Sequence, residues 1–242
     1  MEITFLGSGN AFMAERECGC ILVNDTIMLD AGPGALLSLK RLHKDTAKIT
    51  HIFLSHFHAD HCFGLPFLLL EWMFIAKTDA LLVIVGPAGV EERVHTIMEL
   101  AFPEIMAMGW PRPMIFHEVN PGTVETVAEV TFTAIQVEHG APYQKCYGYR
   151  LQMTEGVLAY SGDTHLCTAL QELVTDARAL IIEADSHPTS PVHIGTTDLR
   201  TLLAGVPATT QIFLNHLDTP DATIWQGLPV TVAEDLRSYT IL

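Results

Sequence analysis

Short apolar runs separated by turn-forming residues recur along the chain and predict many buried strands. Several of these runs are four to six residues long and are bounded by Gly, Pro, Asn or Asp. Near the N-terminus, two runs flank Asn24-Asp25 in the pattern of a hairpin. The predicted strands cover residues 3–5, 21–23, 27–29, 49–54, 81–85, 130–137, 147–153, 157–160, 179–182 and 211–214, with closing strands in 230–242.

Apolar residues at helical spacing follow several of these strands. The predicted helices cover residues 34–43, 65–76, 90–101, 166–174 and a segment carrying Leu199, Leu202 and Leu203, with Thr196 or Thr197 as its cap. Residues 102–113 show no period, so this segment is a packed loop, a loop over a substrate or a subunit contact. Strands alternating with helices indicate an α/β (α+β) fold. We expect one domain over residues 1–242, because no linker or low-complexity tract interrupts the pattern.

Polar residues that can bind metal recur directly after predicted strands. The densest group is Ser55-His56-Phe57-His58-Ala59-Asp60-His61, which lies between an apolar strand and a helix. His139, Asp163 and His216 each follow a later strand. Loops at one edge of a sheet carry function on a rigid scaffold, so we expect these side chains to converge. Zinc favours imidazole and carboxylate ligands, and manganese and iron accept the same set.

Composition and charge narrow the candidate functions. The net charge is −15, from 28 acidic and 13 basic residues, which opposes broad binding to nucleic acid or to anionic membranes. The most apolar stretch, residues 62–76, is interrupted by Gly64, Pro66 and Glu71, so no membrane-spanning helix is expected. Five scattered cysteines and an N-terminus unlike a signal peptide predict a cytoplasmic protein with reduced thiols. Cys18 and Cys20 alone are too few for a structural metal site.

The order of these motifs resembles the metallo-β-lactamase-fold hydrolases. The resemblance is carried by His56-x-His58-x-Asp60-His61, then His139, then Gly162-Asp163-Thr164, then His216. It implies a four-layer αββα sandwich with two divalent metal ions between the sheets, zinc first and manganese or iron as alternatives. By that resemblance His56, His58 and His139 hold one ion, Asp60, His61 and His216 hold the other, and Asp163 bridges them.

A dinuclear centre of this kind can activate a water molecule. Two ions about 3.5–4 Å apart share a water and lower its pKa towards neutrality. Five neutral histidines and two carboxylates leave two dications with a net charge of about +2. A locally positive pocket in an acidic protein favours a small anionic or carbonyl-bearing substrate over a long polyanion.

Within the superfamily, the chain is most similar to ribonuclease Z and to the cyclic-phosphate phosphodiesterase of phosphonate breakdown. Glu183 and His193 resemble the acid–histidine pair of ribonuclease Z, which implies that His193 protonates the leaving oxygen. With Asp60, they are the predicted catalytic residues. The stretch 185–188 resembles one in the phosphodiesterase. The long tRNA-binding arm has no room between His139 and Asp163, and the basic N-terminal loop is reduced to Arg16.

Several alternatives remain open from the sequence. The favoured function is hydrolysis of a small phosphodiester, and the alternatives are a lactonase or thioester hydrolase, ribonuclease Z-like RNA processing, and a non-hydrolytic metal-binding module. Asp30 either orients a ligand histidine or caps the following helix. His165, two residues after Asp163, is the least certain of the other histidines. The Met- and Trp-rich segment 102–113 is compatible with a homodimer.

Overall fold

The protein is described by a computed structural model that covers residues 1–140 and 144–242, and it contains two seven-stranded sheets. The first sheet has the order β14-β1-β2-β3-β4-β5-β6 and the second the order β13-β12-β11-β10-β9-β8-β7. The strands of the first sheet are β1 Glu2–Gly7, β2 Cys20–Val23, β3 Ile27–Leu29, β4 His51–Phe53, β5 Leu82–Gly86, β6 Met114–Glu118 and β14 Arg237–Thr240. Those of the second are β7 Val124–Val127, β8 Val130–Val137, β9 Cys146–Met153, β10 Gly156–Tyr160, β11 Ala177–Glu183, β12 Gln211–Asn215 and β13 Thr231–Val232.

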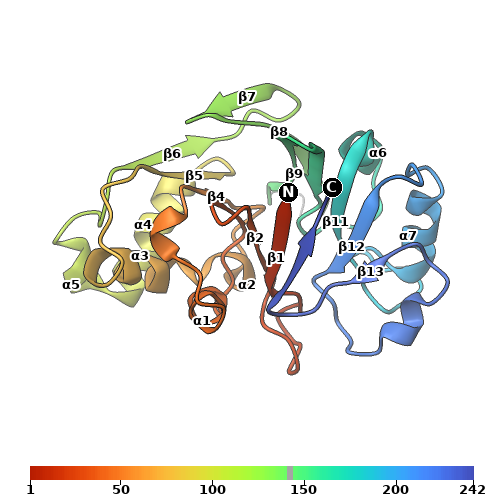
Figure 1. The fold of residues 1–242 in the computed structure, drawn as a ribbon, viewed down its shortest axis with the longest axis horizontal. Helices are drawn as coiled ribbons and strands as arrows, with labels where there is room; N and C mark the ends of the chain where they lie inside the picture. The colour runs from red at the N-terminus through yellow and green to blue at the C-terminus, as the bar shows by residue number, and fades with distance from the viewer. Residues whose placement is uncertain (141–143) are drawn as a thin grey trace.

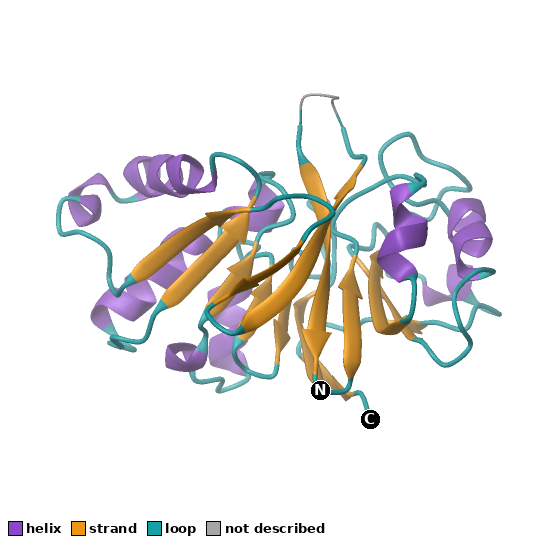
Figure 2. Cartoon of the chain, turned by 90° about the horizontal axis from the view of Figure 1, so that it is seen from above, coloured by secondary structure: helices purple, strands orange, loops and turns teal. Residues whose placement is uncertain are grey.

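Helices cover the outer face of each sheet (Figures 1 and 2). The helices that accompany the first sheet are α1 Ala35–Arg41, α2 Ala59–Cys62, α3 Leu65–Phe74, α4 Val90–Ala101 and α5 Pro103–Met106. Those beside the second sheet are α6 Ala169–Val174 and α7 Thr196–Leu203. Two short 3-10 turns, η1 Thr46–Lys48 and η2 Ala222–Trp225, complete the secondary structure of the described residues.

Three apolar cores hold the four layers together. The central core lies between the sheets, where the Phe53 ring is 5.0 Å from that of Phe132 and 5.2 Å from that of Tyr149. A second core joins the first sheet to α1, α3 and α4, with Trp72 fully buried in it. A third core joins the second sheet to α6 and α7. Each sheet therefore buries both faces, and the predicted αββα sandwich is confirmed.

Strand direction brings the later motifs to one edge of the second sheet. β10, β11 and β12 are parallel to one another, and β8 is antiparallel to β9, which is antiparallel to β10. β8, β10, β11 and β12 therefore all end at the same edge. In the first sheet β4 is parallel to β3 and β5. Each of these strands is hydrogen-bonded to a neighbouring strand on both sides, which fixes the position of the residue that follows it.

Some sequence-based expectations are wrong in detail. β6 and β7 are absent from the prediction, because both are only half-buried and contain no sustained apolar run. The segment 102–113 is not a plain loop: it contains α5, and Trp110 packs on the outer core of the first sheet. Neither Thr196 nor Thr197 caps α7, since Gly195 occupies the N-cap position and no side chain bonds to it. In residues 1–140 and 144–242, no helix has the length and apolar character needed to cross a bilayer.

Candidate metal centre

The first half of the candidate site is the loop that follows β4. His56 is fully buried and His61 nearly so, while His58 is exposed at the N-cap of the short helix α2. Asp60 and His61 are consecutive residues in the single turn of α2, so their side chains point to adjacent sides of this helix. The rings of His56 and His61 lie 4.2 Å apart and those of His56 and His58 4.4 Å apart.

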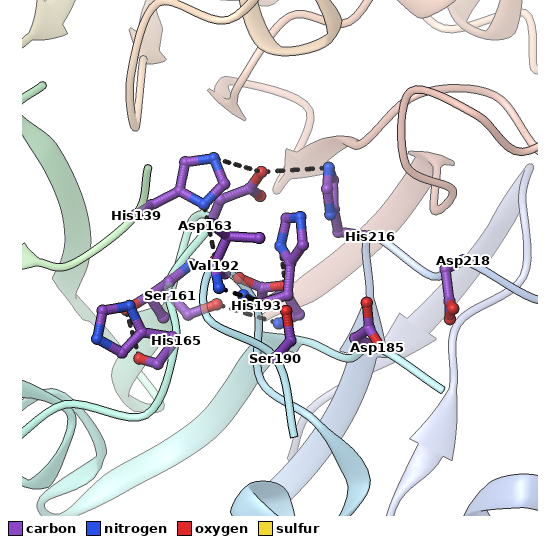
Figure 3. Close-up of polar contacts among 12 residues, drawn as sticks. His139, Ser161, Asp163, His165, Asp185, Ser190, Val192, His193, His216 and Asp218 are labelled. Atoms are coloured by element: carbon purple, nitrogen blue, oxygen red, sulfur yellow. Dashed lines mark hydrogen bonds and ion pairs between the residues drawn. The ribbon is translucent and has the colours of Figure 1, made fainter. Parts of the chain in front are cut away.

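The second half comes from the loops after β8, β10 and β12. His139 and His216 lie on opposite sides of the Asp163 carboxylate, and dashed lines join both rings to it (Figure 3). The Nε2–Oδ2 distances are 3.7 Å for His139 and 3.4 Å for His216. His216 adopts a left-handed backbone conformation with φ of 53°, which turns its side chain inward from the end of β12.

Asp163 stands at the centre of the assembled cluster. Its Oδ2 is 3.3 Å from His61 Nε2 and 3.9 Å from His56 Nε2, in addition to the two contacts described above. The Asp60 Oδ2 atom lies 3.4 Å from His61 Nε2 and 3.3 Å from His216 Nε2. Two groups of potential ligand atoms result, each within 4.8 Å: His56, His58, His139 and Asp163 in one, and Asp60, His61 and His216 in the other. The structure thus brings all seven predicted metal ligands together.

A buried carboxylate, Asp30, orients one of these imidazoles. His61 Nδ1 donates to Asp30 Oδ2 over 2.7 Å, and the Ser55 amide and hydroxyl and the Tyr160 hydroxyl also donate to this carboxylate. A second N–H held in this way fixes the tautomer and turns Nε2 toward the cluster. Asp30 is therefore not a helix cap; Gly34 occupies the N-cap of α1.

A backbone carbonyl has the same effect on His139. Its Nδ1 donates to the carbonyl of Val192 over 2.8 Å (Figure 3). This leaves the lone pair of Nε2 facing His58 and Asp163. Sequence reasoning missed Ser55, Tyr160 and Val192. Ser55 and Tyr160 each end a predicted strand beside a motif, which is a weak signal, whereas a carbonyl contact leaves no mark on residue type.

The electrostatics of the cluster follow from burial and close approach. Burial alone would raise the pKa of Asp163, but the imidazoles of His216 and His61 hold it well below its ordinary value. Burial lowers the pKa of His56 and of His139, so both rings are neutral at pH 7 and present a lone pair. Neutral imidazole and ionised carboxylate are the states in which these side chains bind metal.

His193 and Glu183 form a pair beside the cluster. Glu183 is buried at the end of β11, and His193 Nδ1 donates to its Oε2 over 2.7 Å. The ring of His193 lies 5.0 Å from that of His139 and 5.5 Å from that of His216. Burial raises the pKa of Glu183 to about 7. Burial would lower the pKa of His193, but its hydrogen bond to Glu183 raises it to about 9.

A model of the beta-lactamase superfamily domain matches residues 25–215, which include every residue of the cluster. The chain belongs to the beta-lactamase superfamily. The expected superfamily is thereby confirmed, and the curated relatives that match include ribonuclease Z and ribonuclease BN, in line with the expected branch. Ribonuclease Z of Staphylococcus carnosus is 33% identical over 159 residues, which are 63% of this chain and 49% of the relative. The chain spans about half the length of the curated relatives it matches.

Solved structures agree on the metallo-β-lactamase fold. Human tRNase Z, short form, superposes with a TM-score of 0.78 at 22% identity, over 100% of both chains. A diphosphatase from the PhnP family superposes with a TM-score of 0.74 at 19% identity, over 99% of this chain and 97% of the other. At these identities the likeness establishes the arrangement of layers and strands.

The superfamily fold implies divalent metal ions, and the residues present fit them. His56 Nε2 and His61 Nε2 are buried and have no hydrogen-bond partner within the described residues. An unsatisfied buried polar atom is costly, and cations that accepted these two lone pairs, one in each ligand group, would remove that cost. Two ligands of one tetrahedral zinc lie about 3.3 Å apart, close to the 3.3–3.9 Å contacts around Asp163 and Asp60.

Other residues considered from the sequence lie outside the cluster. His165 turns away from the cluster (Figure 3). Its Nε2 pairs with Glu138 Oε2 over 3.3 Å. No cysteine joins a metal-capable group within residues 1–140 and 144–242, and Cys20 donates instead to the Asp30 carbonyl. His187 forms a hydrogen bond with Asp185, and these two residues and Asp218 form a group separate from the cluster.

Proposed function

We propose that this chain is a metal-dependent hydrolase with a dinuclear centre and that it cleaves a small phosphodiester. The observation that carries the proposal is the placement of His193. Its Nδ1 is held by Glu183, and its other nitrogen faces the cluster, with a ligand atom within 4.8 Å of those of Asp163 and His216. A histidine so held, beside seven converging ligand atoms, has the geometry of a general acid.

The residues divide the work between holding ions and moving a proton. His56, His58 and His139 would hold one ion, Asp60, His61 and His216 the other, and Asp163 would contact both. When bound, two divalent ions supply Lewis-acid polarisation of a phosphoryl oxygen and an activated water nucleophile. Asp30 and the Val192 carbonyl keep His61 and His139 in the tautomer that binds metal.

His193 then completes the cleavage. Protonated Nε2 donates its proton to the oxygen of the departing alcohol, and Glu183 stabilises the imidazolium through Nδ1. General acid catalysis of this kind contributes about 10²–10⁴-fold to the rate. It matters most for a phosphodiester with a poor alkoxide leaving group. Asp60 is assigned to the metal centre and acts in catalysis through His61 and His216, which its Oδ2 contacts.

Ribonuclease Z-like RNA processing is the second candidate, and the curated relatives favour it. Two features of this chain favour a smaller substrate. Arg16, the basic residue of the N-terminal loop, turns inward and donates to Ser8 Oγ and the Ala233 carbonyl, so its guanidinium is committed within the fold. The net charge of −15 also repels a long polyanion. Zinc is the first choice of ion, with manganese or iron compatible with the same ligands.

A parallel substrate screen tests the proposal. Protein reconstituted with zinc, manganese or iron is assayed on small phosphodiesters, a lactone, a thioester and a precursor tRNA, with Asp163→Ala as the blank. We expect turnover of the phosphodiesters and its loss in the blank. If only the lactone or the thioester is hydrolysed, and His193→Ala leaves that activity unchanged, the protein is a lactonase or thioester hydrolase and not a phosphodiesterase. Preference for the precursor tRNA would establish RNA processing instead. Absence of both stoichiometric metal and turnover would leave a non-hydrolytic module.

A further inference from the structure

The loop that follows β11 carries two groups that the proposed mechanism uses. His193 is the proposed general acid, and the Val192 carbonyl fixes the tautomer of His139. Residues 184–195 contain no helix or strand, so no regular ladder of backbone hydrogen bonds holds either group. The position of both groups therefore depends on the side-chain and loop contacts that anchor this segment.

Asp218 binds the beginning of this loop with both of its carboxylate oxygens. Its Oδ1 accepts the amide of Ser186 over 2.9 Å, and its Oδ2 accepts the Ser186 hydroxyl over 2.6 Å. Only 18% of the Asp218 side chain is exposed, and hydrogen bonds to a carboxylate are stronger than neutral ones. Asp218 lies two residues after His216, a proposed metal ligand. The two bonds therefore tie the loop after β12 to the loop after β11.

Backbone contacts carry this constraint from Ser186 to His193. The amide of Asp185, next to Ser186, donates to the carbonyl of Ile194 over 2.9 Å and closes the loop at its base. Ile194 follows His193 directly and is fully buried in the third core. The two ends of the loop are thus held together. Asp218 holds that base against the loop after β12.

The contacts around Asp218 are those of a clamp between two loops. Asp185, His187 and Asp218 place potential ligand atoms within 4.8 Å of one another. Asp185 Oδ1 already accepts the amide and Nδ1 of His187, over 2.8 and 2.7 Å, and Asp218 is bonded as described above. Figure 3 shows both carboxylates on the His216 side of His193. Carboxylates that are satisfied by protein donors in this way fix the backbone of the segments they join.

We propose that Asp218 is a positioning residue for general acid catalysis. Through Ser186 it holds the loop that carries His193 against the loop that carries His216. The inference rests on the proposed phosphodiesterase function and adds a residue that acts through Ser186 and not on the substrate. Without the clamp, Glu183 still bonds to His193, but the loop is no longer fixed from the side of β12. Misplacing a catalytic group by about 1 Å costs about 10²-fold in rate, and the loss falls on protonation of the leaving oxygen.

The leaving-group dependence of hydrolysis tests this role. Thymidine 5′-(4-nitrophenyl phosphate) releases nitrophenolate without protonation, whereas both ester bonds of thymidine 5′-(methyl phosphate) have an alkoxide leaving group that needs a proton. With saturating metal, Asp218→Ala should lower kcat for the methyl ester about tenfold or more and change kcat for the nitrophenyl ester by less than about twofold.

Two further variants distinguish positioning from a general loss of structure. Ser186→Ala removes the hydroxyl bond and keeps the amide bond, so it should lower kcat for the methyl ester by a smaller factor, about threefold. Asp218→Asn places an amide group that accepts the Ser186 N–H and donates to the Ser186 hydroxyl. It should therefore retain most of the rate. If Asp218→Ala does not fold, Ser186→Ala decides the question by the same comparison of the two esters.

The matched control is Asp221→Ala. Asp221 makes the same pair of bonds with Thr223, from its amide over 3.0 Å and from its hydroxyl over 2.6 Å, at the start of η2. Its loss should leave both rates unchanged. The chain therefore provides two aspartates with equal local bonding, of which only Asp218 joins the loops that carry His193 and His216.

Nuclear magnetic resonance of ¹⁵N-histidine-labelled, zinc-loaded protein gives a readout that does not depend on turnover. The Nδ1–H of His193, bonded to Glu183, is assigned by the loss of its signal in His193→Gln. We expect this proton to exchange with water about tenfold faster in Asp218→Ala and at the wild-type rate in Asp221→Ala. Elemental analysis should find the same metal content in all of these proteins.

The outcomes separate the clamp from the hydrolase. If Asp218→Ala slows both esters equally, or neither, the clamp is wrong and the phosphodiesterase stands. If the wild type hydrolyses no ester, the phosphodiesterase fails, and the His193 signal still tests the clamp: unchanged exchange in Asp218→Ala overturns it. Loss of bound metal in Asp218→Ala, with an unchanged His193 signal, would assign Asp218 to the metal centre instead.

Discussion

The pair formed by Glu183 and His193 gives the sharpest test of the proposed mechanism. Glu183→Gln is nearly isosteric and removes the charge that favours the protonated imidazole. Glu183 is buried and uses both carboxylate oxygens: Oε2 accepts the His193 Nδ1–H over 2.7 Å, and Oε1 accepts the Thr164 amide. The glutamine has a single side-chain oxygen, so the variant loses the charge together with one of these two hydrogen bonds.

The size of the effect follows from the pKa of His193. The rise from its ordinary value of 6.5 to about 9 corresponds to about 3 kcal/mol at 1.36 kcal/mol per pKa unit. This matches the upper range for a hydrogen bond to a charged group. Without the carboxylate, the lowering effect of burial remains, so the pKa falls to 6.5 or below. A general acid works only when protonated, so its contribution at pH 8 falls about thirtyfold. At pH 5.5 the two proteins should differ far less.

The assay is the pH profile of kcat/KM for a phosphodiester with a poor leaving group, measured with saturating metal. Activity should fall as pH rises through the pKa of His193, and Glu183→Gln should move this fall to lower pH by about 2.5 pH units or more. Bound cations lower the pKa of His193 in both proteins, so the displacement between the profiles is the quantity to compare. Glu138→Gln is the matched control, because Glu138 pairs with His165 outside the cluster. Superimposable alkaline limbs for wild type and Glu183→Gln would refute the assignment of His193 as general acid.

Three further predictions concern the metal centre and the core. Asp163→Ala should lower bound metal from about two ions per chain to about one or fewer, because Oδ2 faces both ligand groups; elemental analysis after dialysis checks this, and unchanged stoichiometry would contradict a bridging role. Asp30→Asn should weaken metal binding about 10–100-fold, since it disturbs the orientation of His61; competition with a chelating dye measures it, and unaltered affinity would count against that role. Phe132→Ala, in the central core, should lower the free energy of unfolding, measured in urea, by about 3–5 kcal/mol. The control is Phe12→Ala: this side chain is 93% exposed, and its loss should change the free energy by less than about 0.5 kcal/mol. Equal effects of the two substitutions would show that the sheets do not depend on this packing.

The local part of the site could be predicted from the sequence because it lies within one loop. His56, His58, Asp60 and His61 are held by a strand on one side and a helix on the other, and both flanks have clear apolar patterns. The αββα layers were predicted only through the family resemblance that these motifs carry. By contrast, β6 and β7 escaped prediction because half-buried edge strands need few apolar residues.

The role of Asp30 illustrates what local sequence leaves open. Its position before a helix is equally compatible with a cap and with an orienting carboxylate, and only the approach of Ser55, His61 and Tyr160 from three other segments decides between them. The N-cap of α7 is similar. Thr196 and Thr197 have the right chemistry, but the chain enters the helix at Gly195, where a Cβ would lie 2.5 Å from the Pro188 carbonyl oxygen.

The amino-acid sequence by itself determined which residues can bind metal, because imidazole and carboxylate chemistry is a property of residue type. It also determined which segments are buried, through apolar periodicity. Only the tertiary structure decided that His139 and His216 face the same carboxylate, because that depends on parallel strands ending at one edge and on two sheets packing face to face. The hydrogen bond from His139 to the Val192 carbonyl and the cation–π contact between Arg93 and Phe57 are likewise decided by the tertiary structure. These contacts join residues far apart in the chain, and their geometry is set by long-range packing that no local pattern encodes.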